Sequence, residues 1–377
     1  MPIPPSLTLA ERHTRLQAAL SAQSLTAMVV TSAPNIRYLT NHDGSAGVLV
    51  VSPTGMHLIV DGRYTQAVRA KQESPYACPS LTLHDVPTSY DAATIDLLAG
   101  LGASVAGFEA GHVTVARHAG WLRTLASRGM AVELRPVEGM VERARAVKDA
   151  SEIETLRRSA RGLTPVASAV LKAMRAGMTE RVLAGVIEAE LRAAGYDRVA
   201  FEPIVASGPN AALPHYRAGD RVISEGDMVV LDFGGVLDGY CSDLTRTVSV
   251  GEPSDELRRV YGAVLDAQQA AIHAIRPGNT TEAVDAAARS VLVECGLGEA
   301  FSHGTGHGIG LEIHEDPRLA RAASSAPTAL EAGMVTTVEP GAYLPGWGGI
   351  RIEDDILVTS TGYEILTNVP RHLLVVG

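Results

Sequence analysis

The strongest constraint on the fold is an order of elements that occurs twice between residue 149 and the end of the chain. Each half reads helix, helix, strand, strand, with turn residues between the elements. The first set of patterns covers 149–175, 179–194, 227–232 and 243–249. The second set covers 254–275, 281–295, 335–339 and 350–359. This order predicts two antiparallel ribbons, each backed by helices, that face each other around a pseudo-two-fold axis.

Acidic residues occupy matching places in the two ribbons. Asp232 ends the apolar run VVL, and Asp243 lies at the start of the return strand, after the turn-forming sequence GGVLDG. Glu339 and Glu353 stand at the equivalent points of the second ribbon, on either side of a connection rich in Pro and Gly. Closure of the two hairpins therefore predicts two pairs of neighbouring carboxylates.

Four carboxylates with apolar flanks need positive charge nearby. Burying an unpaired carboxylate is strongly unfavourable, and like charges at short range repel one another. The basic candidates are Arg246 and Arg351, one in each ribbon, and two arginines are too few to neutralise four acids. We therefore interpret the pattern as a metal centre.

The stretch SHGTGHGIGLEIHE, residues 302–315, lies between the two ribbons in the sequence. Its glycines allow the backbone to pass close to a crowded centre, and His307 can add one nitrogen ligand. Four carboxylates and one imidazole suit two divalent ions of intermediate hardness, such as Mn²⁺, Co²⁺, Fe²⁺ or Zn²⁺.

Taken singly, these features have simpler interpretations. Asp232 alone is typical of a turn, and His215 in ALPHYR is typical of a polar loop. The alternating glycines are not G-x-G-x-x-G, and HEDPR is not H-E-x-x-H, so neither a phosphate loop nor a zincin helix is indicated. The metal interpretation depends on the combined pattern.

Four motifs carry a resemblance to a known family: LDFGGVLDGYCSDLTRT, HGTGHGIGLEIHE, VEPGAY and GIRIEDD. They resemble the metal-ligand motifs of the pita-bread metallopeptidases, which include methionine aminopeptidase, aminopeptidase P and prolidase. NIRYLT and VDGRY resemble the creatinase-type N-terminal domain of the Xaa-Pro branch. The resemblance implies an α+β protein with a creatinase-like α/β domain at 1–145 and a duplicated pita-bread catalytic domain at 146–377.

The resemblance also implies a set of site residues. Five of them would be metal ligands, namely Asp232, Asp243, His307, Glu339 and Glu353. Asp243 and Glu353 would bridge two divalent ions, with Mn²⁺ expected ahead of Co²⁺, Zn²⁺ and Fe²⁺. The catalytic group would contain His215, His303, His314, Glu339 and Arg351. Arg351 would have either a structural role or a role in carboxylate recognition.

The implied reaction is cleavage of the Xaa-Pro bond of dipeptides or short peptides by a metal-bridging hydroxide. Glu339 would be the general base, while His215 and His314 stabilise the oxyanion and His303 orients the substrate. We favour an Xaa-Pro dipeptidase, a prolidase. The alternatives are an aminopeptidase P that acts on longer peptides, a creatinase-like C–N hydrolase and a non-catalytic pita-bread binding protein.

Composition limits the partners and the cellular location that we expect for the protein. A net charge of −10 argues against a general nucleic-acid surface, and no apolar run reaches the roughly 20 residues of a membrane span. Three separated cysteines and an N-terminus without signal-peptide features lead us to expect a cytoplasmic protein. The resemblance implies a homodimer. In the first domain we expect a mixed sheet with helices on its faces. We interpret TSAPNIRYLTNHDGSAG either as a loop under this domain or as a segment that borders the substrate cleft.

Overall fold

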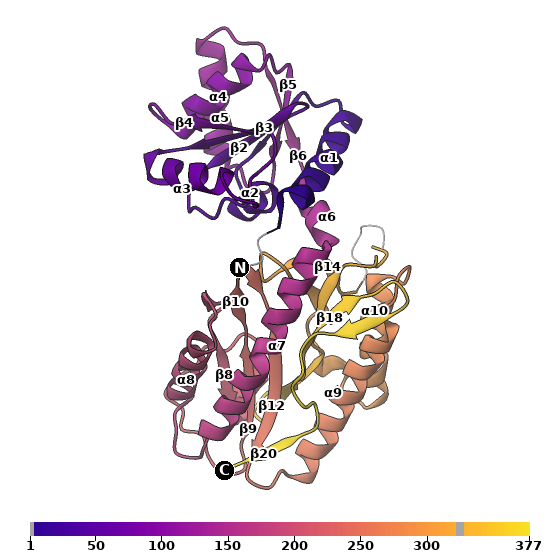
Figure 1. The fold of residues 1–377 in the computed structure, drawn as a ribbon. Helices are drawn as coiled ribbons and strands as arrows, with labels where there is room; N and C mark the ends of the chain where they lie inside the picture. The colour runs from indigo at the N-terminus through magenta and orange to yellow at the C-terminus, as the bar shows by residue number, and fades with distance from the viewer. Residues whose placement is uncertain (1–3, 322–327) are drawn as a thin grey trace. The chain divides into compact units, whose positions relative to one another are not determined.

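The computed structural model describes residues 4–321 and 328–377. Two compact units divide the chain, Met1–Arg145 and Ala146–Gly377. Figure 1 shows both units as mixtures of helices and strands, and each is described here by itself.

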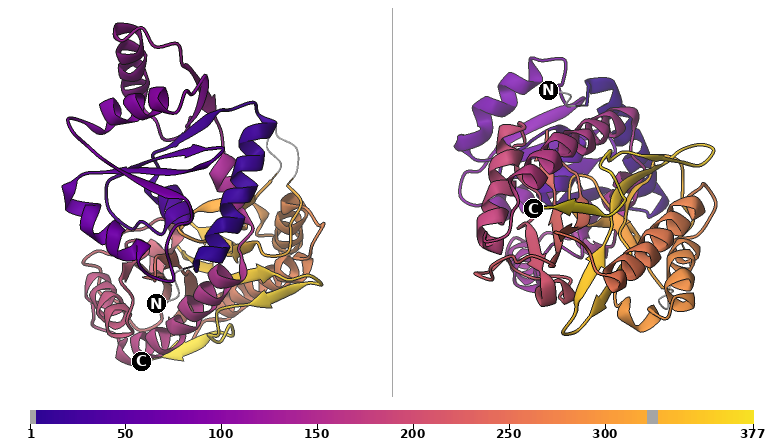
Figure 2. Two further views of the ribbon diagram at one scale, coloured as in Figure 1. Left: turned by 45° about the horizontal axis from the view of Figure 1, so that its top comes forward. Right: turned by 90° about the horizontal axis from the view of Figure 1, so that it is seen from below.

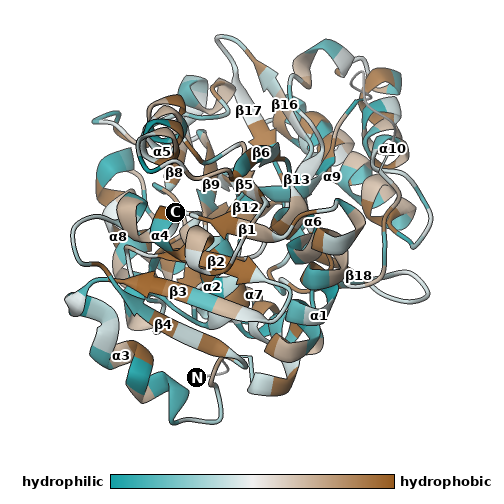
Figure 3. Ribbon diagram, turned by 90° about the horizontal axis from the view of Figure 1, so that it is seen from above, coloured by the Kyte–Doolittle hydropathy of each residue, from teal (hydrophilic) through white to brown (hydrophobic). Residues whose placement is uncertain are grey.

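The first unit is built on one six-stranded mixed sheet in the order β4-β3-β2-β1-β5-β6. Its strands are β1 Ala27–Val30, β2 Val48–Ser52, β3 Gly55–Val60, β4 Leu81–Asp85, β5 Val105–Glu109 and β6 Glu133–Val137. Its helices are α1 Ser6–Ala22, α2 Ala33–Thr40, α3 Gly62–Gln72, α4 Tyr90–Gly100, α5 Val115–Ser127 and α6 Met140–Ala146. Strand β1 pairs antiparallel with β2 and parallel with β5. The central strands β1 and β2 are largely hydrophobic in Figure 3, as expected for strands with helices on both faces.

The prediction of a loop at TSAPNIRYLTNHDGSAG is wrong for its middle part, which forms helix α2. Pro34 stands at the first turn of this helix, where its missing N–H costs nothing, and Asn41 ends the helix with a φ of 62°. Ile36 and Leu39 are buried, so packing stabilises this short helix more than its sequence propensity does.

The second unit contains the duplicated elements. Its helices are α7 Ala150–Ala173, α8 Glu180–Ala193, α9 Asp255–Ala274 and α10 Thr281–Glu294, with short 3₁₀ turns η1 Gly208–Ala212 and η2 Gly298–Ala300. The strands of its first half are β7 Arg198–Val199, β8 Ile204–Ser207, β9 Met228–Phe233, β10 Gly235–Leu237, β11 Tyr240–Cys241 and β12 Leu244–Val250. The strands of its second half are β13 Gly306–Gly308, β14 Glu315–Leu319, β15 Val335–Val338, β16 Gly341–Leu344, β17 Gly348–Arg351, β18 Asp354–Val358, β19 Tyr363–Ile365 and β20 Leu374–Val376.

Strand β9 explains how an aspartate can end an apolar run. Side chains alternate between the two faces of a strand, so Val229 and Leu231 pack into one core cluster while Val230 packs into the other. Asp232 shares the face of Val230 and lies opposite Thr245 of the antiparallel strand β12. The first predicted ribbon is therefore present, and its register puts polar groups at one end of a strand that is otherwise apolar.

The second ribbon pairs β15 with β18, with Val338 opposite Asp354. The prediction of one continuous strand over 350–359 is wrong, because the chain leaves β17 at Arg351 and enters β18 at Asp354. Strand β17 pairs with β16 in a separate two-stranded sheet. Glu353 lies at this change of sheet, where its backbone N–H donates to the carbonyl of Thr245 in the first ribbon.

Helices of the second unit begin at clear capping residues. Asp149 and Glu152 form a capping box at α7, and Ser254 and Thr280 cap α9 and α10. Helices α9 and α10, orange in Figure 2, lie side by side. Among the described residues, no helix is long and apolar enough to cross a bilayer.

Candidate metal centre and catalytic site

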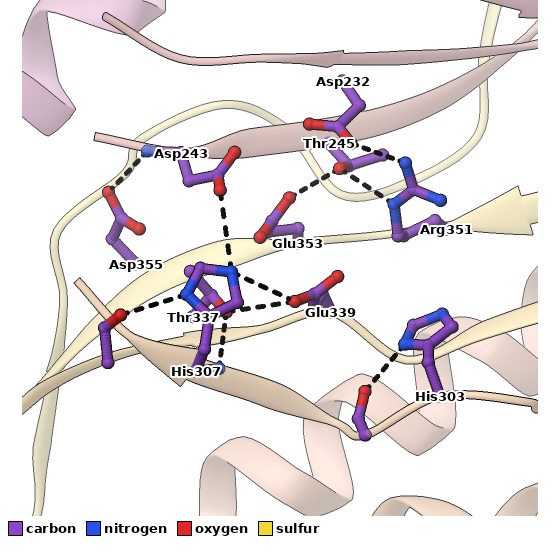
Figure 4. A network of polar contacts seen from close by, with 12 residues as sticks. Asp232, Asp243, Thr245, His303, His307, Thr337, Glu339, Arg351, Glu353 and Asp355 are labelled. Carbon is purple, nitrogen blue, oxygen red and sulfur yellow. Dashed lines mark hydrogen bonds and ion pairs between the residues drawn. The ribbon is translucent and has the colours of Figure 1, made fainter. Parts of the chain in front are cut away.

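The five predicted ligands come from five separate places in the second unit. Asp232 belongs to β9, Asp243 directly precedes β12, and His307 belongs to β13. Glu339 directly follows β15, and Glu353 lies between β17 and β18. Figure 4 shows that all five side chains point toward one region between the two ribbons.

Distances support a shared centre. One ligand atom from each of Asp243, His307 and Glu353 lies within 4.8 Å of the others. His307 Nε2 lies 3.4 Å from Glu339 Oε1 and 3.9 Å from Asp243 Oδ2. Asp232, Asp243 and Glu353 are at most 8% exposed, so this is an interior cluster of acids.

Burial and mutual repulsion shift the pKa values of these acids upward. Burial, followed by the charges of Glu353 and Asp232, raises the pKa of Asp243 well above its usual range. Burial, followed by the charges of Glu339 and Asp232, does the same to the pKa of Glu353. Burial also raises the pKa of Glu339 to about 8. The cluster is therefore costly for the fold unless positive charge compensates it.

The two ribbon arginines have different partners. Arg351 Nη2 donates to Asp232 Oδ2 at 2.5 Å. Arg246 Nη2 instead pairs with Asp354 Oδ1 at 2.8 Å, and its other N–H groups donate to backbone carbonyls, including that of Glu353. Only one of the two arginines thus neutralises the acid cluster. The sequence suggested two positive charges for four carboxylates, so the excess of negative charge that metal ions would compensate is larger than expected.

The donor atoms fit a divalent cation. Burial lowers the pKa of His307 to about 4, so its ring is neutral at pH 7. Nδ1 donates to the carbonyl of Gly308 at 3.0 Å, which leaves the lone pair of Nε2 facing the oxygens of Glu339 and Asp243. Such an arrangement is repulsive unless a cation lies between the atoms. Asp232 Oδ1 is buried and has no hydrogen-bond partner in the described part of the chain, so it also offers a free ligand atom.

The glycines around His307 are required for close approach. A Cβ on Gly306 would lie 2.0 Å from the carbonyl oxygen of Thr337, and a Cβ on Gly308 would lie 2.2 Å from that of Asp316. The short strand β13 is thereby held between β14 and β15, which brings His307 to the acids. These contacts explain why ionisable groups occur on a glycine-rich segment.

A directed chain of hydrogen bonds links Arg351 to His303. Arg351 Nη1 donates to the Tyr343 hydroxyl at 2.8 Å, and that hydroxyl donates to His303 Nε2 at 2.9 Å. His303 Nδ1 then donates to the carbonyl of Gly304 at 2.7 Å. This pattern holds His303 in one neutral tautomer, and burial lowers its pKa to about 4.

His303 should contribute to acid sensitivity. Its pKa is lowered on folding from 6.5 to about 4, so between these values the unfolded chain binds a proton that the folded chain does not. Stability is therefore present above pH 6.5 and falls as the pH approaches 4, by up to about 1.4 kcal/mol per pH unit for one group. We expect His303→Asn to flatten the pH dependence of the free energy of unfolding, measured by urea titration of chelator-treated protein. The exposed His372→Asn should not; an unchanged slope for His303→Asn would contradict this account.

The three predicted histidines line a cavity together with an arginine that the sequence analysis did not single out. His215, His303, His314 and Arg318 border the same cavity as Glu339. The positive charge of Arg318 contributes to lowering the pKa of His314, after burial. Arg318 follows His314 by four residues in HEDPR. A basic residue this close to the histidine motif is the sequence feature that could have predicted its place at the cavity.

Two further polar residues support the acids and were also missed. Thr245 Oγ1 donates to Glu353 Oε2 at 2.5 Å and accepts from Arg351 Nε at 3.3 Å. Asp355 Oδ2 accepts the backbone N–H of Asp243 at 3.1 Å. Both residues lie inside the quoted motifs LDFGGVLDGYCSDLTRT and GIRIEDD, but their contacts with the acids depend on how the two ribbons meet.

Comparisons with known proteins agree with this architecture. The sequence pattern of the creatinase/prolidase N-terminal domain matches residues 12–147, and that of metallopeptidase family M24 matches residues 154–360. An uncharacterized peptidase of Bacillus subtilis, YqhT, is 38% identical over 348 residues, which are 92% of this chain and 95% of that protein.

Two solved structures are similar along nearly the whole chain. An Xaa-Pro dipeptidase from Bacillus anthracis has 37% identity and a TM-score of 0.91, covering 98% of this chain and 100% of its own. An X-Pro aminopeptidase from Thermotoga maritima has 35% identity and a TM-score of 0.85, covering 97% of this chain and 99% of its own. The predicted resemblance and fold class are confirmed: the chain belongs to metallopeptidase family M24 and has a creatinase/prolidase N-terminal domain.

Proposed function

We propose that this protein is an Xaa-Pro dipeptidase, a prolidase that hydrolyses the bond before a C-terminal proline. The observation that carries the proposal is the convergence of four acids and one neutral histidine beside a cavity lined by His215, His314 and Arg318. Similarity to the Bacillus anthracis dipeptidase supports the substrate class.

The metal ligands in this proposal are the five converging side chains. Asp232, Asp243, His307, Glu339 and Glu353 would together hold two divalent ions. Mn²⁺ is our first choice, ahead of Co²⁺, Zn²⁺ and Fe²⁺, because mixed oxygen and nitrogen donors suit ions of intermediate hardness. Two bound divalent ions supply Lewis acidity and bring the pKa of a water toward neutrality.

The protein's own groups position the substrate and move the proton. Glu339 accepts the proton of the attacking water and delivers it to the leaving proline nitrogen, because its carboxylate borders both the acid cluster and the cavity. His215 and His314 donate to the oxygen that becomes negative as the carbonyl is attacked. His303 stands at the cavity wall in a fixed tautomer and orients the peptide.

Arg351 and Arg318 have separate roles in this proposal. Arg351 is 3% exposed, and its guanidinium donates hydrogen bonds to Asp232, Tyr343 and Thr245. Because these N–H groups are already bound to protein atoms, we assign Arg351 a positioning role. Arg318 is exposed at the cavity, and within the described residues no carboxylate lies at ion-pair distance from it. We assign recognition of the proline carboxylate to Arg318, because a dipeptide carries that charge next to the scissile bond.

Substitution of Arg318 tests this assignment. We expect Arg318→Ala to lower kcat/KM for Ala-Pro by roughly 10- to 100-fold, chiefly through KM, since a charged hydrogen bond contributes about 1.5–3 kcal/mol. Cleavage of Ala-Pro amide, which lacks the carboxylate, should change little. Arg276→Ala removes an exposed arginine elsewhere in the unit and serves as the control. Equal losses on both substrates would remove Arg318 from carboxylate recognition.

An aminopeptidase P activity on longer peptides is the second candidate, favoured by similarity to the Thermotoga maritima enzyme. Comparing Ala-Pro with Ala-Pro-Ala, with Mn²⁺ added to chelator-treated protein, separates the two. A dipeptidase should cleave Ala-Pro at least about tenfold faster, as expected when a charged contact is lost. Preference for Ala-Pro-Ala would support the aminopeptidase, and no cleavage of either would count against both.

The assembly and location of the protein are part of the proposal. The family resemblance supports a homodimer, which light scattering coupled to gel filtration can test. Cys78, Cys241 and Cys295 are all free thiols, which supports a reducing cytoplasm.

A further inference from the structure

A buried carboxylate lies outside the acid cluster, at the first turn of α8. Glu180 is 0% exposed, and among the described residues it has no basic side chain within ion-pair distance. Its charge is instead satisfied by hydrogen bonds. Burying a carboxylate costs free energy that its hydrogen-bond donors must offset. Those donors therefore identify the part of the chain that Glu180 stabilises.

All of these donors come from a single segment, residues 207–219. Glu180 Oε1 accepts from the N–H of Ser207 at 2.8 Å, from its hydroxyl at 2.7 Å, and from Asn210 Nδ2 at 3.0 Å. Glu180 Oε2 accepts from the Tyr216 hydroxyl at 2.9 Å and from the N–H of Gly219 at 3.3 Å. The carboxylate thus binds the beginning, the middle and the end of the segment.

The same segment carries His215, which lines the cavity beside the acids. One neighbour, Pro214, has its carbonyl within reach of Arg351 Nη1 at 3.4 Å. The other neighbour, Tyr216, donates to Glu180 and accepts from Asn210 Nδ2 at 2.8 Å. His215 itself is exposed, so its place depends on the anchors on either side of it.

We propose that Glu180 is a positioning residue for the reaction, in that its carboxylate fixes the segment 207–219 and so sets His215 at the cavity. The inference deepens the proposed function and rests on it. Segments with few buried contacts open easily, whereas several charge-assisted hydrogen bonds to one buried acceptor hold the segment in one conformation. Misplacement of a catalytic group by about 1 Å can lower a rate by about 100-fold.

Glu180→Gln is the most informative substitution. It keeps the side-chain volume, but its amide N–H groups face hydrogen-bond donors of the segment 207–219 where the carboxylate oxygens accepted. In the Mn²⁺-loaded protein we expect kcat/KM for Ala-Pro to fall by roughly 10- to 100-fold, mainly in kcat, with Mn²⁺ affinity unchanged. Tyr216→Phe removes one of the hydrogen bonds to Glu180, together with the one that the hydroxyl accepts from Asn210. It should cost about 2- to 10-fold, so it keeps the proposal testable if Glu180→Gln does not fold. Glu188→Gln changes an exposed acid of the same helix and is the matched control, with no expected effect.

Two readouts distinguish positioning from general stability. Amide hydrogen exchange across 207–219 should become at least about tenfold faster in Glu180→Gln and stay unchanged in Glu188→Gln. In a His215→Ala background, Glu180→Gln should add less than about a twofold further loss, because both changes affect one group. An equal loss with and without His215, or unchanged exchange in the segment, would overturn the proposal. Failure of the unmodified protein to cleave Ala-Pro would count against the proposed function instead, and the exchange measurement would still decide the role of Glu180.

Discussion

Replacing Glu353 with glutamine is expected to stabilise the chelator-treated protein while abolishing turnover. Burial and neighbouring acids raise the pKa of Glu353 well above its usual range, so its ionised form costs folding free energy at neutral pH. Glutamine has the same shape without the charge and still accepts from Thr245. Each pKa unit by which burial disfavours the ionised carboxylate costs about 1.4 kcal/mol of folding free energy while the group stays charged, and the amide avoids this cost.

The loaded protein should respond in the opposite sense. With one proposed ligand carboxylate neutralised, we expect the rise in Tm on adding Mn²⁺ to be largely lost and kcat on Ala-Pro to fall by at least about 10³-fold. Differential scanning fluorimetry with and without Mn²⁺, together with a proline-release assay, measures both effects. Glu331→Gln alters an exposed acid and should leave both unchanged. A variant that loses stability without metal yet keeps turnover would refute the ligand role of Glu353.

His215→Ala should separate catalysis from metal binding. His215 is exposed and lines the cavity without belonging to the group of candidate ligands, so its removal should leave Mn²⁺ affinity and Tm close to those of the unmodified protein. Loss of an oxyanion donor typically lowers kcat by about 10²- to 10³-fold. Calorimetric Mn²⁺ titration and steady-state kinetics on Ala-Pro check the two parts.

The exposed His372→Ala is the control for this variant, because it removes an imidazole of the same unit away from the cavity. Normal turnover in His215→Ala would exclude His215 from the mechanism. It would also exclude the proposed route by which Glu180 acts.

Much of the second unit could be predicted from the sequence because strong local signals agree with the fold. The alternation of apolar side chains in MVVLDF and the turn residues that follow it determine the register that puts Asp232 opposite Thr245. Capping residues such as Ser254 and Thr280 mark helix starts that the structure also shows. The four acids were recognisable because they stand at or near the ends of apolar strands, where an unpaired carboxylate is costly to bury.

Other features depend on contacts between distant residues and left no local signal. Glu180 stands at the start of a helix, where an acid is favourable to the helix dipole in any case, so nothing marked its bonds to residues 207–219. Arg246 belongs to a buried strand beside the ligands, yet it pairs with Asp354, 108 residues away. The change of sheet at Glu353 requires β16 and β17 to pair with each other, which the sequence IRIEDDILVT at 350–359 does not indicate.

We propose that five side chains hold two divalent ions and that these ions are required for cleavage before proline. The decisive experiment is calorimetric titration of Mn²⁺ into chelator-treated protein, with release of proline from Ala-Pro followed in parallel. We predict two ions bound per chain, and activity that appears as the sites fill. Binding of no Mn²⁺, or full activity in the chelator-treated protein, would show that these side chains do not form a catalytic metal centre.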